Sequence, residues 1–594
     1  MNTVWTAVRP LIVSAFRTGP AKFAGAVTLL LLGYLATPAV ALLLKGVTDA
    51  ALSGATGTVV WLALATATAL VLELMLGHFA HLLYFELGEM GEAALQEETL
   101  HVANGTPGLE HLDSPRFADL LALVRQDLHR TRQLLEAVLQ LGGLVVQSVV
   151  TAVILGLLDP WLILLPVAAV PPILIGRRAQ ALVDRGKEAS ATPVRRSRHL
   201  LDLATAADSV KELRLYRAER PLLRRHQRDW DAATDVLVHA HARAALLRAG
   251  GQLLFALAYG AAILLVVDQA LAGRSTVGDL VLLITLAVQV STQVATALGL
   301  FVMVQEGGRT FERLEELKEK AAEHRHGGGT APVPQRMSGE IRLENVGFRY
   351  PGGDRYILRG LDLTLPAGST VALVGENGAG KSTLVKLLCG MYRPTEGRIL
   401  VDGTDLRDFE PGAWMARVAP LFQDFARLEL LLRENVGIGA VGSVDDDEAV
   451  LGAMARARAE KVLARVPGGL NGLLGRTYGD GAELSGGQWQ TLGLARTLMR
   501  ERPLLQILDE PASALDAAAE HAVFERFGSD ARRSRRSLGA VTVFISHRFS
   551  TVRMADLIVV LDGGRIREAG SHDELMAAGG TYREVFTLQA HVYH

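Results

Sequence analysis

A glycine-rich loop with one lysine and two hydroxyl residues is the clearest chemical feature of this sequence. It reads Gly375-Glu376-Asn377-Gly378-Ala379-Gly380-Lys381-Ser382-Thr383. An apolar run at 371–374 precedes it and a helix-like run at 384–388 follows, which is the context of a phosphate-binding loop. Glycines let the backbone N–H groups surround phosphate oxygens at a helix N-terminus. Lys381 could then reach the β- and γ-phosphates and Ser382 could bind Mg²⁺; an accidental glycine-rich turn is the alternative.

Further polar residues follow two predicted strands. The apolar run 504–508 leads into Asp509 and Glu510, and the run 541–545 is followed closely by His547. Ligands bind at the C-terminal ends of strands in open α/β sheets, so we expect these side chains near the glycine-rich loop. Asp509 could hold Mg²⁺ through water, Glu510 could act as general base and His547 could contact the γ-phosphate. Taken singly, each could also be an ordinary polar residue after a strand.

The composition differs between the two halves of the chain. Of 594 residues, 49% are hydrophobic and 21% are charged, but the long uncharged runs all precede residue 305. A chain of this length is expected to form at least two domains. The formal net charge of −2 gives no support for binding nucleic acid. The single cysteine, Cys389, excludes an intramolecular disulfide and a cysteine metal cluster, and we expect it to pack as a small apolar residue.

Six apolar segments approach the roughly 20 residues that a membrane-spanning helix needs. They are expected at about 22–44, 59–83, 134–157, 160–178, 246–270 and 277–303. Residues 1–20 are typical of an amphipathic helix on a membrane surface, and we expect the first span to be retained and not cleaved as a signal peptide. Lys and Arg are concentrated between 177 and 245, which places 84–133 and 178–245 in the cytoplasm.

These two cytoplasmic stretches are too long to be simple turns. Their helical periodicity predicts helices that extend beyond the membrane, with tips near 109–117 and 206–216 where the pattern breaks. Such tips could transmit movement between the two domains. Solvated hairpins are the alternative.

Polar residues within the spans could line a pore or pack between helices. Three groups repeat on one helix face: Thr285, Gln289, Thr292 and Thr296 in the sixth span, Gln140 and Gln147 in the third, and Gln252 and Tyr259 in the fifth. Glu73 in the second span could be a proton or substrate site, or a hydrogen-bonded structural residue.

The predicted fold class joins an α-helical membrane domain of six spans to an α/β phosphate-loop ATPase domain. Alternating apolar residues at 341–346 and 361–365 indicate strands with one buried face. We expect an amphipathic helix at 1–20, the membrane domain at 21–305, a linker at 306–338 and the nucleotide-binding domain at 339–594.

The C-terminal domain resembles an ATP-binding-cassette (ABC) ATPase, and the whole chain resembles an exporter half-transporter of that superfamily. The motifs stand in the order of the family. Tyr350 matches the aromatic residue that stacks on adenine, and the Walker A loop is represented by Gly375, Asn377, Gly378, Gly380, Lys381, Ser382 and Thr383. Gln423 matches the glutamine that senses Mg²⁺, and the signature sequence contains Ser485, Gly486, Gly487 and Gln488. Walker B ends in Asp509 and Glu510, and it is followed by the D-loop Asp516 and the switch His547.

The resemblance implies ATP and Mg²⁺ as ligands. In the family the signature sequence completes the ATP site of a second subunit, which implies a dimer here. A hydroxyl and close backbone at a helix start also suit a phosphate on physical grounds. Intact motifs favour a homodimer, and a heterodimer with a degenerate partner is the alternative.

Three positions depart from the family pattern. Gln506 places an amide in the Walker B strand, where it would need a hydrogen-bond partner. Ala512 replaces a common threonine, with little expected effect. Gly479, beside Asp480, stands where exporters usually carry a glutamate, which puts coupling through that loop in doubt.

The resemblance implies an ATP-hydrolysing exporter that works by alternating access in the bacterial inner membrane, with the ATPase domain in the cytoplasm. The lipid bilayer, a second half-transporter and the exported substrate are the expected partners. Residues 421–430 and 486–490 resemble exporters of lantibiotic-type peptides, which favours a peptide natural product; a drug or lipid is the alternative. No peptidase-like domain precedes the first span, so leader cleavage is not expected. Glu510 argues against an ATP-gated channel or regulator, and the fused domains argue against an importer.

Overall fold

The computed structural model describes residues 9, 11–13, 15–165, 167–323, 329–476, 479–510, 534–546 and 549–592. Its chain separates into two compact units. The membrane unit comprises Met1–Thr99 and Ala122–Glu316, and the ATPase unit comprises Leu100–Leu121 and Leu317–His594. Half of the predicted helix over 1–20 lies outside the described residues, and of the other half 9, 11–13 and 15–18 are helical.

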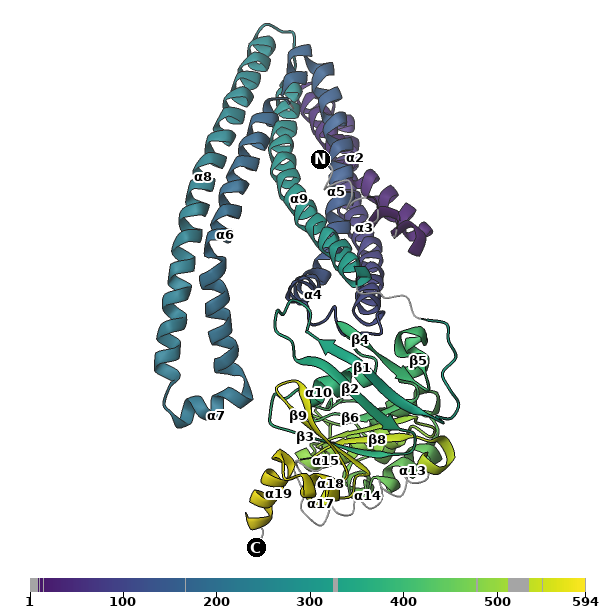
Figure 1. The fold of residues 1–594 in the computed structure, drawn as a ribbon. Helices are drawn as coiled ribbons and strands as arrows, with labels where there is room; N and C mark the ends of the chain where they lie inside the picture. The colour runs from purple at the N-terminus through teal and green to yellow at the C-terminus, as the bar shows by residue number, and fades with distance from the viewer. Residues whose placement is uncertain are drawn as a thin grey trace. The chain divides into compact units, whose positions relative to one another are not determined.

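Long helices build the membrane unit (Figure 1). Their bounds are α2 (Pro20–Leu52), α3 (Thr56–Asn104), α4 (Pro115–Asp127), α5 (Thr131–Leu158), α6 (Val170–Thr205), α7 (Ala207–Leu215), α8 (Glu219–Leu271) and α9 (Val277–Glu323), of which α3, α4 and α9 continue into the ATPase unit. Several are far longer than a bilayer requires, as predicted. α6 and α8 lie side by side and the short α7 joins them, at the predicted tip 206–216.

Five helical stretches in the described part of the chain are long and apolar enough to cross a membrane. They are α2, α3, the continuous stretch Pro115–Leu158, α8 and α9. The predicted span at 160–178 is not one helix: the 3₁₀ helices η2 (Pro160–Leu164) and η3 (Val167–Ala169) precede α6, which becomes charged from Arg177 onward. Pro160, Pro171 and Pro172 lack the backbone N–H that a continuous helix uses, which accounts for the interruption.

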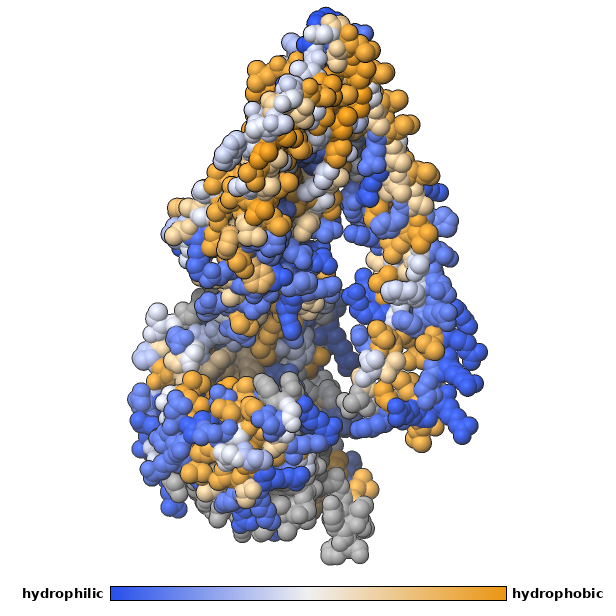
Figure 2. All heavy atoms as spheres, turned by 180° about the vertical axis from the view of Figure 1, so that it is seen from behind, coloured by the Kyte–Doolittle hydropathy of each residue, from blue (hydrophilic) through white to orange (hydrophobic). Residues whose placement is uncertain are grey.

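The outer helices of the membrane unit expose large apolar side chains. On α3, Trp61 is 75% exposed, and Val71, Phe79 and Leu82 are each more than half exposed. Figure 2 shows hydrophobic residues gathered over the long helices. Extended apolar surface of this kind suits contact with lipid chains.

Two sheets form the core of the ATPase unit. Within the described residues, one has the order β2–β1–β4–β5 and the other the order β10–β9–β3–β8–β7–β6. The strands are β1 (Glu340–Phe348), β2 (Leu358–Pro366), β3 (Thr370–Val374), β4 (Glu396–Val401), β5 (Thr404–Asp405), β6 (Val418–Leu421), β7 (Leu505–Asp509), β8 (Val541–Ile545), β9 (Leu557–Asp562) and β10 (Arg565–Gly570). The predicted strands are therefore confirmed. Because β9, β3, β8, β7 and β6 are parallel, their C-terminal ends meet at one edge.

Helices and buried side chains complete this unit. The described helices are α10 (Lys381–Leu388), α11 (Pro411–Met415), α12 (Leu432–Gly437), α13 (Asp447–Arg456), α14 (Glu460–Arg465), α15 (Gly486–Leu498), α17 (Phe549–Val552), α18 (His572–Ala578) and α19 (Thr581–Val592). Cys389 is buried in the core, as expected, and burial raises the pKa of its thiol to about 12. Gln506 finds a partner on the neighbouring strand, because its Oε1 accepts a hydrogen bond from Thr542 Oγ1 at 3.2 Å.

The segment 105–114 between α3 and α4, here called the first tip, packs within the ATPase unit. Leu109 N donates to Met391 O at 2.9 Å, and Arg393 N donates to Glu110 Oε1 at 3.1 Å. The Tyr392 hydroxyl donates to Asp113. These contacts link the chain between two membrane helices to the residues that follow α10.

Candidate nucleotide-binding site

The glycine-rich loop connects β3 to α10 in a conformation that requires glycine. Gly380 precedes α10 with a φ of 102°, and Gly375 has a φ of 152°. A Cβ added to Gly375 would lie 2.2 Å from the carbonyl oxygen of Leu561. At Gly380 it would lie 2.6 Å from Leu358 Cδ2. The loop therefore approaches its neighbours too closely for a side chain, and such a backbone can present N–H groups to phosphate.

Lys381 and Ser382 begin α10 at the edge of this loop. Lys381 Nζ donates to the carbonyl oxygens of Gly375 at 2.7 Å and Glu376 at 2.9 Å, so the ammonium lies across the loop. Burial lowers the pKa of Lys381, although the carboxylates of Asp509 and Glu510 oppose this change. A phosphate placed there would restore the preference for the charged ammonium.

Ser382 and Asp509 bring together two oxygen ligands suited to Mg²⁺. Ser382 Oγ donates to Asp509 Oδ2 at 3.0 Å. Burial raises the pKa of Asp509, and the hydrogen bond from Ser382 partly opposes that rise. A divalent cation would favour the ionised carboxylate. The described residues contain no cluster of three or more His, Cys, Asp or Glu side chains suited to a metal, and Mg²⁺ typically needs only one or two carboxylates beside phosphates and waters.

Glu510 is held in an unusual backbone conformation directly after β7. Its φ is 48°, in the left-handed region that is uncommon for residues other than glycine. Glu510 N donates to Ile545 O at 3.1 Å, and Gln490 Nε2 donates to Glu510 O at 3.2 Å. Gln423 Nε2 donates to Glu510 Oε2 at 2.9 Å. Both main chain and carboxylate are thus positioned by neighbours, and Gln490 is a positioning residue to which the sequence reasoning gave no role.

Tyr350 contacts the helix that follows the loop. Its hydroxyl lies 3.1 Å from Thr383 Oγ1, and its ring packs edge-on against Phe348 and Tyr392 at centroid distances of 5.1 and 5.4 Å. Tyr392 in turn contacts Asp113 of the first tip. A chain of contacts thus runs from the loop to the first tip. Sequence reasoning missed Tyr392 because no local motif marks a contact so distant along the chain.

The signature residues open α15 with a reciprocal cap. Ser485 N donates to Gln488 Oε1 at 2.9 Å, and Gln488 N donates to Ser485 Oγ at 3.4 Å. Ser485 and Gly486 are exposed, and a Cβ added to Gly486 would meet nothing within 4 Å. This helix start therefore leaves room for a ligand or another chain.

The structure describes only some of the remaining predicted positions. Asp516, His547 and Ala512 lie outside the described residues. Gly479 and Asp480 are exposed, and a Cβ added to Gly479 would meet nothing within 4 Å.

The polar residues of the membrane spans mostly contact other helices or their own backbone. Glu73 Oε1 accepts a hydrogen bond from Thr37 Oγ1 at 2.6 Å, and Gln289 Nε2 donates to Thr37 O at 3.1 Å. Thr285 and Thr292 donate to carbonyl oxygens of α9 itself. The contacts of Glu73 and Gln289 with Thr37 favour helix packing at these two positions, whereas bonds within α9 are compatible with either role.

The two units match two family descriptions. Residues 23–294 match the ABC transporter transmembrane region family, and residues 358–513 match the ABC transporter family. The chain belongs to the ABC transporter family. This chain carries one transmembrane region and one ATPase domain, which is the composition of a half-transporter, and it is a multi-pass membrane protein.

Relatives of this ABC transporter include proteins with different cargoes in their names. It is 36% identical over 338 residues to the ATP-dependent lipid A-core flippase of Chromohalobacter salexigens, covering 57% of this chain and 56% of that protein. It is 31% identical over 394 residues to the subtilin transport ATP-binding protein SpaT of Bacillus subtilis, covering 66% and 62%. The matched part of the chain therefore spans less than two thirds of either relative. A solved bacterial Atm1-family ABC exporter with ATP bound has a TM-score of 0.77 and 26% identity, covering 97% of this chain and 98% of that one.

Proposed function

We propose that this half-transporter exports a substrate across the bacterial inner membrane by ATP-driven alternating access. The main support is the set of hydrogen-bonded side chains at the edge of the phosphate-binding loop, where Ser382 pairs with Asp509 and Gln423 pairs with Glu510. The same chain also has a membrane unit. The likeness of nearly the whole chain to an exporter with ATP bound supports this proposal. The proposed parts are a helix at 1–20, a membrane domain at 21–305, a linker at 306–338 and a cytoplasmic ATPase domain at 339–594.

The proposed chemistry assigns a role to each part of the site. The backbone of the Walker A loop and Lys381 bind the phosphates, and Tyr350 stacks on adenine. Ser382, Asp509 and Gln423 hold Mg²⁺, which when bound offsets phosphate charge. Glu510 accepts a proton from the attacking water, and His547 contacts the γ-phosphate.

A second chain is proposed to complete each ATP site. The exposed start of α15 supports this, because Ser485 and Gly486 are open to another molecule. In the dimer Ser485, Gly486, Gly487, Gln488 and Asp516 face the ATP held by the partner. A homodimer is favoured over a heterodimer. The first tip and α7 transmit closure of the ATPase domains to the membrane helices.

For the substrate, a peptide natural product is the first choice and a lipid the second. The relation to a subtilin transport protein supports the peptide, and the relation to a lipid A-core flippase supports the lipid. Inside-out proteoliposomes separate them, with ATP-dependent uptake of a fluorescent lantibiotic-type peptide in one arm and flipping of a fluorescent phospholipid in the other.

The test of ATP-driven turnover compares wild type with Glu510→Gln. We expect ATP binding to remain and hydrolysis to fall by about 10²-fold or more, the usual contribution of a general base. Glu501→Gln is the matched control because Glu501 is exposed outside the site. Equal hydrolysis in wild type and Glu510→Gln would refute the exporter mechanism.

A further inference from the structure

One hydrogen bond joins the helix that begins at the signature residues to the backbone of the proposed general base. Gln490 lies on α15, which begins directly after Ser485, and its Nε2 donates to the carbonyl oxygen of Glu510 at 3.2 Å. Glu510 in turn comes directly after β7. The bond therefore connects a helix that is proposed to face the partner's ATP with the residue that is proposed to activate water beside this chain's own ATP.

The presence of an amide at position 490 is explained by this contact. The Gln490 side chain is only 4% exposed and lies among buried residues of α15. A buried amide costs free energy unless it is hydrogen-bonded, whereas an apolar side chain could fill the same space without a partner. Packing alone would therefore not require glutamine here, and the bond to Glu510 gives its amide a role.

The backbone of Glu510 needs support because its conformation is unfavourable. Its φ of 48° lies in the left-handed region, which residues with a side chain adopt only where their neighbours hold them. Glu510 N donates to Ile545 O at 3.1 Å, and Gln490 holds the carbonyl oxygen on the other side of the Glu510 Cα. These two bonds fix the peptide groups on either side of Glu510, and with them the direction in which its side chain leaves the main chain.

Gln490 reaches Glu510 from a different element than the anchor of the carboxylate does. Gln423, which follows β6, donates to Glu510 Oε2 at 2.9 Å, whereas Gln490 belongs to α15. Ser485 and Gln490 are separated by about one and a half helical turns, or roughly 7.5 Å along the axis. A hydrogen-bonded helix moves as a unit over so short a distance, so a shift at its exposed start would reach the backbone of Glu510.

We propose that Gln490 is a positioning residue that couples the two ATP sites of the dimer. ATP held by the partner contacts the start of α15 and fixes the place of this helix. Gln490 then holds the backbone of Glu510 in its own chain in the conformation that supports hydrolysis. This coupling rests on the proposed function, because it requires a dimer in which the signature residues face the partner's ATP.

The first test replaces the amide with a side chain of similar length that has no donor. In the full-length transporter in nanodiscs, Gln490→Met is expected to lower the kcat of ATP hydrolysis about five-fold, the usual effect of one neutral hydrogen bond. The KM for ATP is expected to change by less than about two-fold, because Gln490 is assigned no contact with ATP. Unchanged kcat, or a loss that appears only in KM, would overturn the proposal.

Thr497→Val is the matched control on the same helix. Thr497 is buried, and its hydroxyl donates to the carbonyl oxygen of Pro420 on β6 at 2.8 Å. This change also removes a buried donor between α15 and a strand, but at a distance from Glu510 along the helix, and it is expected to keep kcat within about two-fold of wild type. Equal losses in Gln490→Met and Thr497→Val would indicate a general loss of packing and would refute the coupling role.

A second variant covers the case in which Gln490→Met does not fold, which gel filtration and the Kd of a fluorescent ATP analogue detect. Gln490→Asn keeps an amide at this position but shortens the side chain by one methylene group, about 1.5 Å, so the bond to Glu510 O is lost. Its kcat is expected to fall as in Gln490→Met. Wild-type kcat in Gln490→Asn would contradict the proposal.

Mixed dimers show in which chain Gln490 acts. One chain carries Glu510→Gln, so that hydrolysis comes from Glu510 of the other chain. Gln490→Met is expected to lower this remaining activity about five-fold when it lies in the chain with the intact Glu510, and by less than about two-fold when it lies in the other chain. The same loss from either chain would mean that Gln490 does not act on the Glu510 of its own chain.

A double-mutant cycle tests the coupling between the sites. Lys381→Met in one chain weakens the ATP that would contact α15 of the other chain, and Gln490→Met is placed in that other chain. If Gln490 carries the coupling, the two changes together lower hydrolysis at the remaining site about as much as either one alone. Losses that multiply would show independent effects and would overturn the proposal.

Failure of this inference is distinct from failure of the proposed function. If wild type hydrolyses no more ATP than Glu510→Gln, the exporter mechanism itself is refuted. If wild type hydrolyses ATP and Gln490→Met does so equally well, only the role of Gln490 is refuted.

Discussion

Two hydrogen bonds define the chemistry of the ATP-binding loop at the scale of single residues. Ser382 Oγ donates to Asp509 Oδ2 at 3.0 Å, and Gln423 Nε2 donates to Glu510 Oε2 at 2.9 Å. The first places a hydroxyl beside a carboxylate, as a Mg²⁺ site requires. The second orients the proposed general base. The first involves the loop whose glycines keep the backbone close to its neighbours, and the second joins residues that follow β6 and β7.

Gly375→Ala is expected to weaken ATP binding more than Gly378→Ala. Both residues have positive φ, so alanine strains each by about 1–3 kcal/mol. Only at Gly375 would the new Cβ also collide with a carbonyl oxygen, because the space beside Gly378 is open within 4 Å. The measurement is the Kd of a fluorescent ATP analogue. Equal losses in the two variants would contradict the steric argument.

At the scale of elements, the first tip joins two helices, α3 and α4, and packs within the ATPase unit. The chain between α3 and α4 belongs to the ATPase unit, where Tyr392 donates to Asp113 and its ring contacts Tyr350. Burial and the bond to Asp113 both raise the pKa of Tyr392, so its hydroxyl remains a donor at neutral pH. ATP bound against Tyr350 would therefore press on residues in direct contact with the first tip.

Tyr392→Phe is expected to uncouple the membrane helices from ATP while leaving ATP affinity unchanged. Loss of a hydrogen bond to a carboxylate costs about 1.5–3 kcal/mol, enough to change a two-state population roughly ten-fold. The readout is the distance between spin labels at Ser53→Cys in the two chains of the dimer, with and without ATP. Cys389 is buried with a raised thiol pKa and does not compete for the label.

The control for this change is Tyr356→Phe, which removes a hydroxyl that donates to Glu396 within the ATPase unit. It is expected to preserve the ATP-dependent change in distance. If Tyr392→Phe preserves it equally, the contact with Asp113 does not carry the movement.

At the scale of the whole molecule, one chain holds two separate helix starts that are proposed to face phosphate. α10 begins with Lys381 and Ser382, and α15 begins after Ser485, which is exposed. Pairing of two chains would let each α15 face the loop of its partner.

A pair of variants tests whether ATP sites form between chains. All chains carry Glu510→Gln so that bound ATP is retained. A mixed dimer with Lys381→Met in one chain and Ser485→Arg in the other is expected to retain labelled ATP, since one shared site remains intact. A dimer with both changes in one chain is expected to retain none. The reverse pattern would place each complete site within a single chain.

The sequence alone determined the features that depend on local spacing. The glycine-rich loop, the residues after β7 and the buried strands could be predicted because turn geometry and strand burial act over a few neighbouring residues. The long apolar helices were predictable for the same reason. The structure of the span at 160–178 could not be predicted as well, because hydrophobicity alone did not reveal the break in the helix near Pro160 and Pro171.

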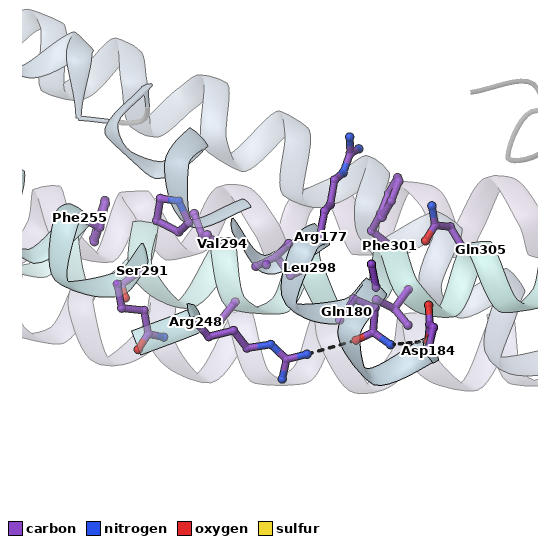
Figure 3. A pocket seen from close by; sticks show the side chains of 17 residues that line it. Arg177, Gln180, Asp184, Arg248, Phe255, Ser291, Val294, Leu298, Phe301 and Gln305 are labelled. Atoms are coloured by element: carbon purple, nitrogen blue, oxygen red, sulfur yellow. Dashed lines mark hydrogen bonds between the residues drawn. The ribbon is translucent and has the colours of Figure 1, made fainter. Parts of the chain in front are cut away.

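Only the tertiary structure decided which distant residues meet. Gln490 with Glu510, Tyr392 with Asp113 and Arg248 with Gln180 are pairs from separate elements, and no local pattern encodes their contact. Tertiary packing also decided which face of α9 lines a pocket together with α6 and α8 (Figure 3). Periodicity defines the faces of a helix, whereas its neighbours in the folded chain determine which face meets a cavity.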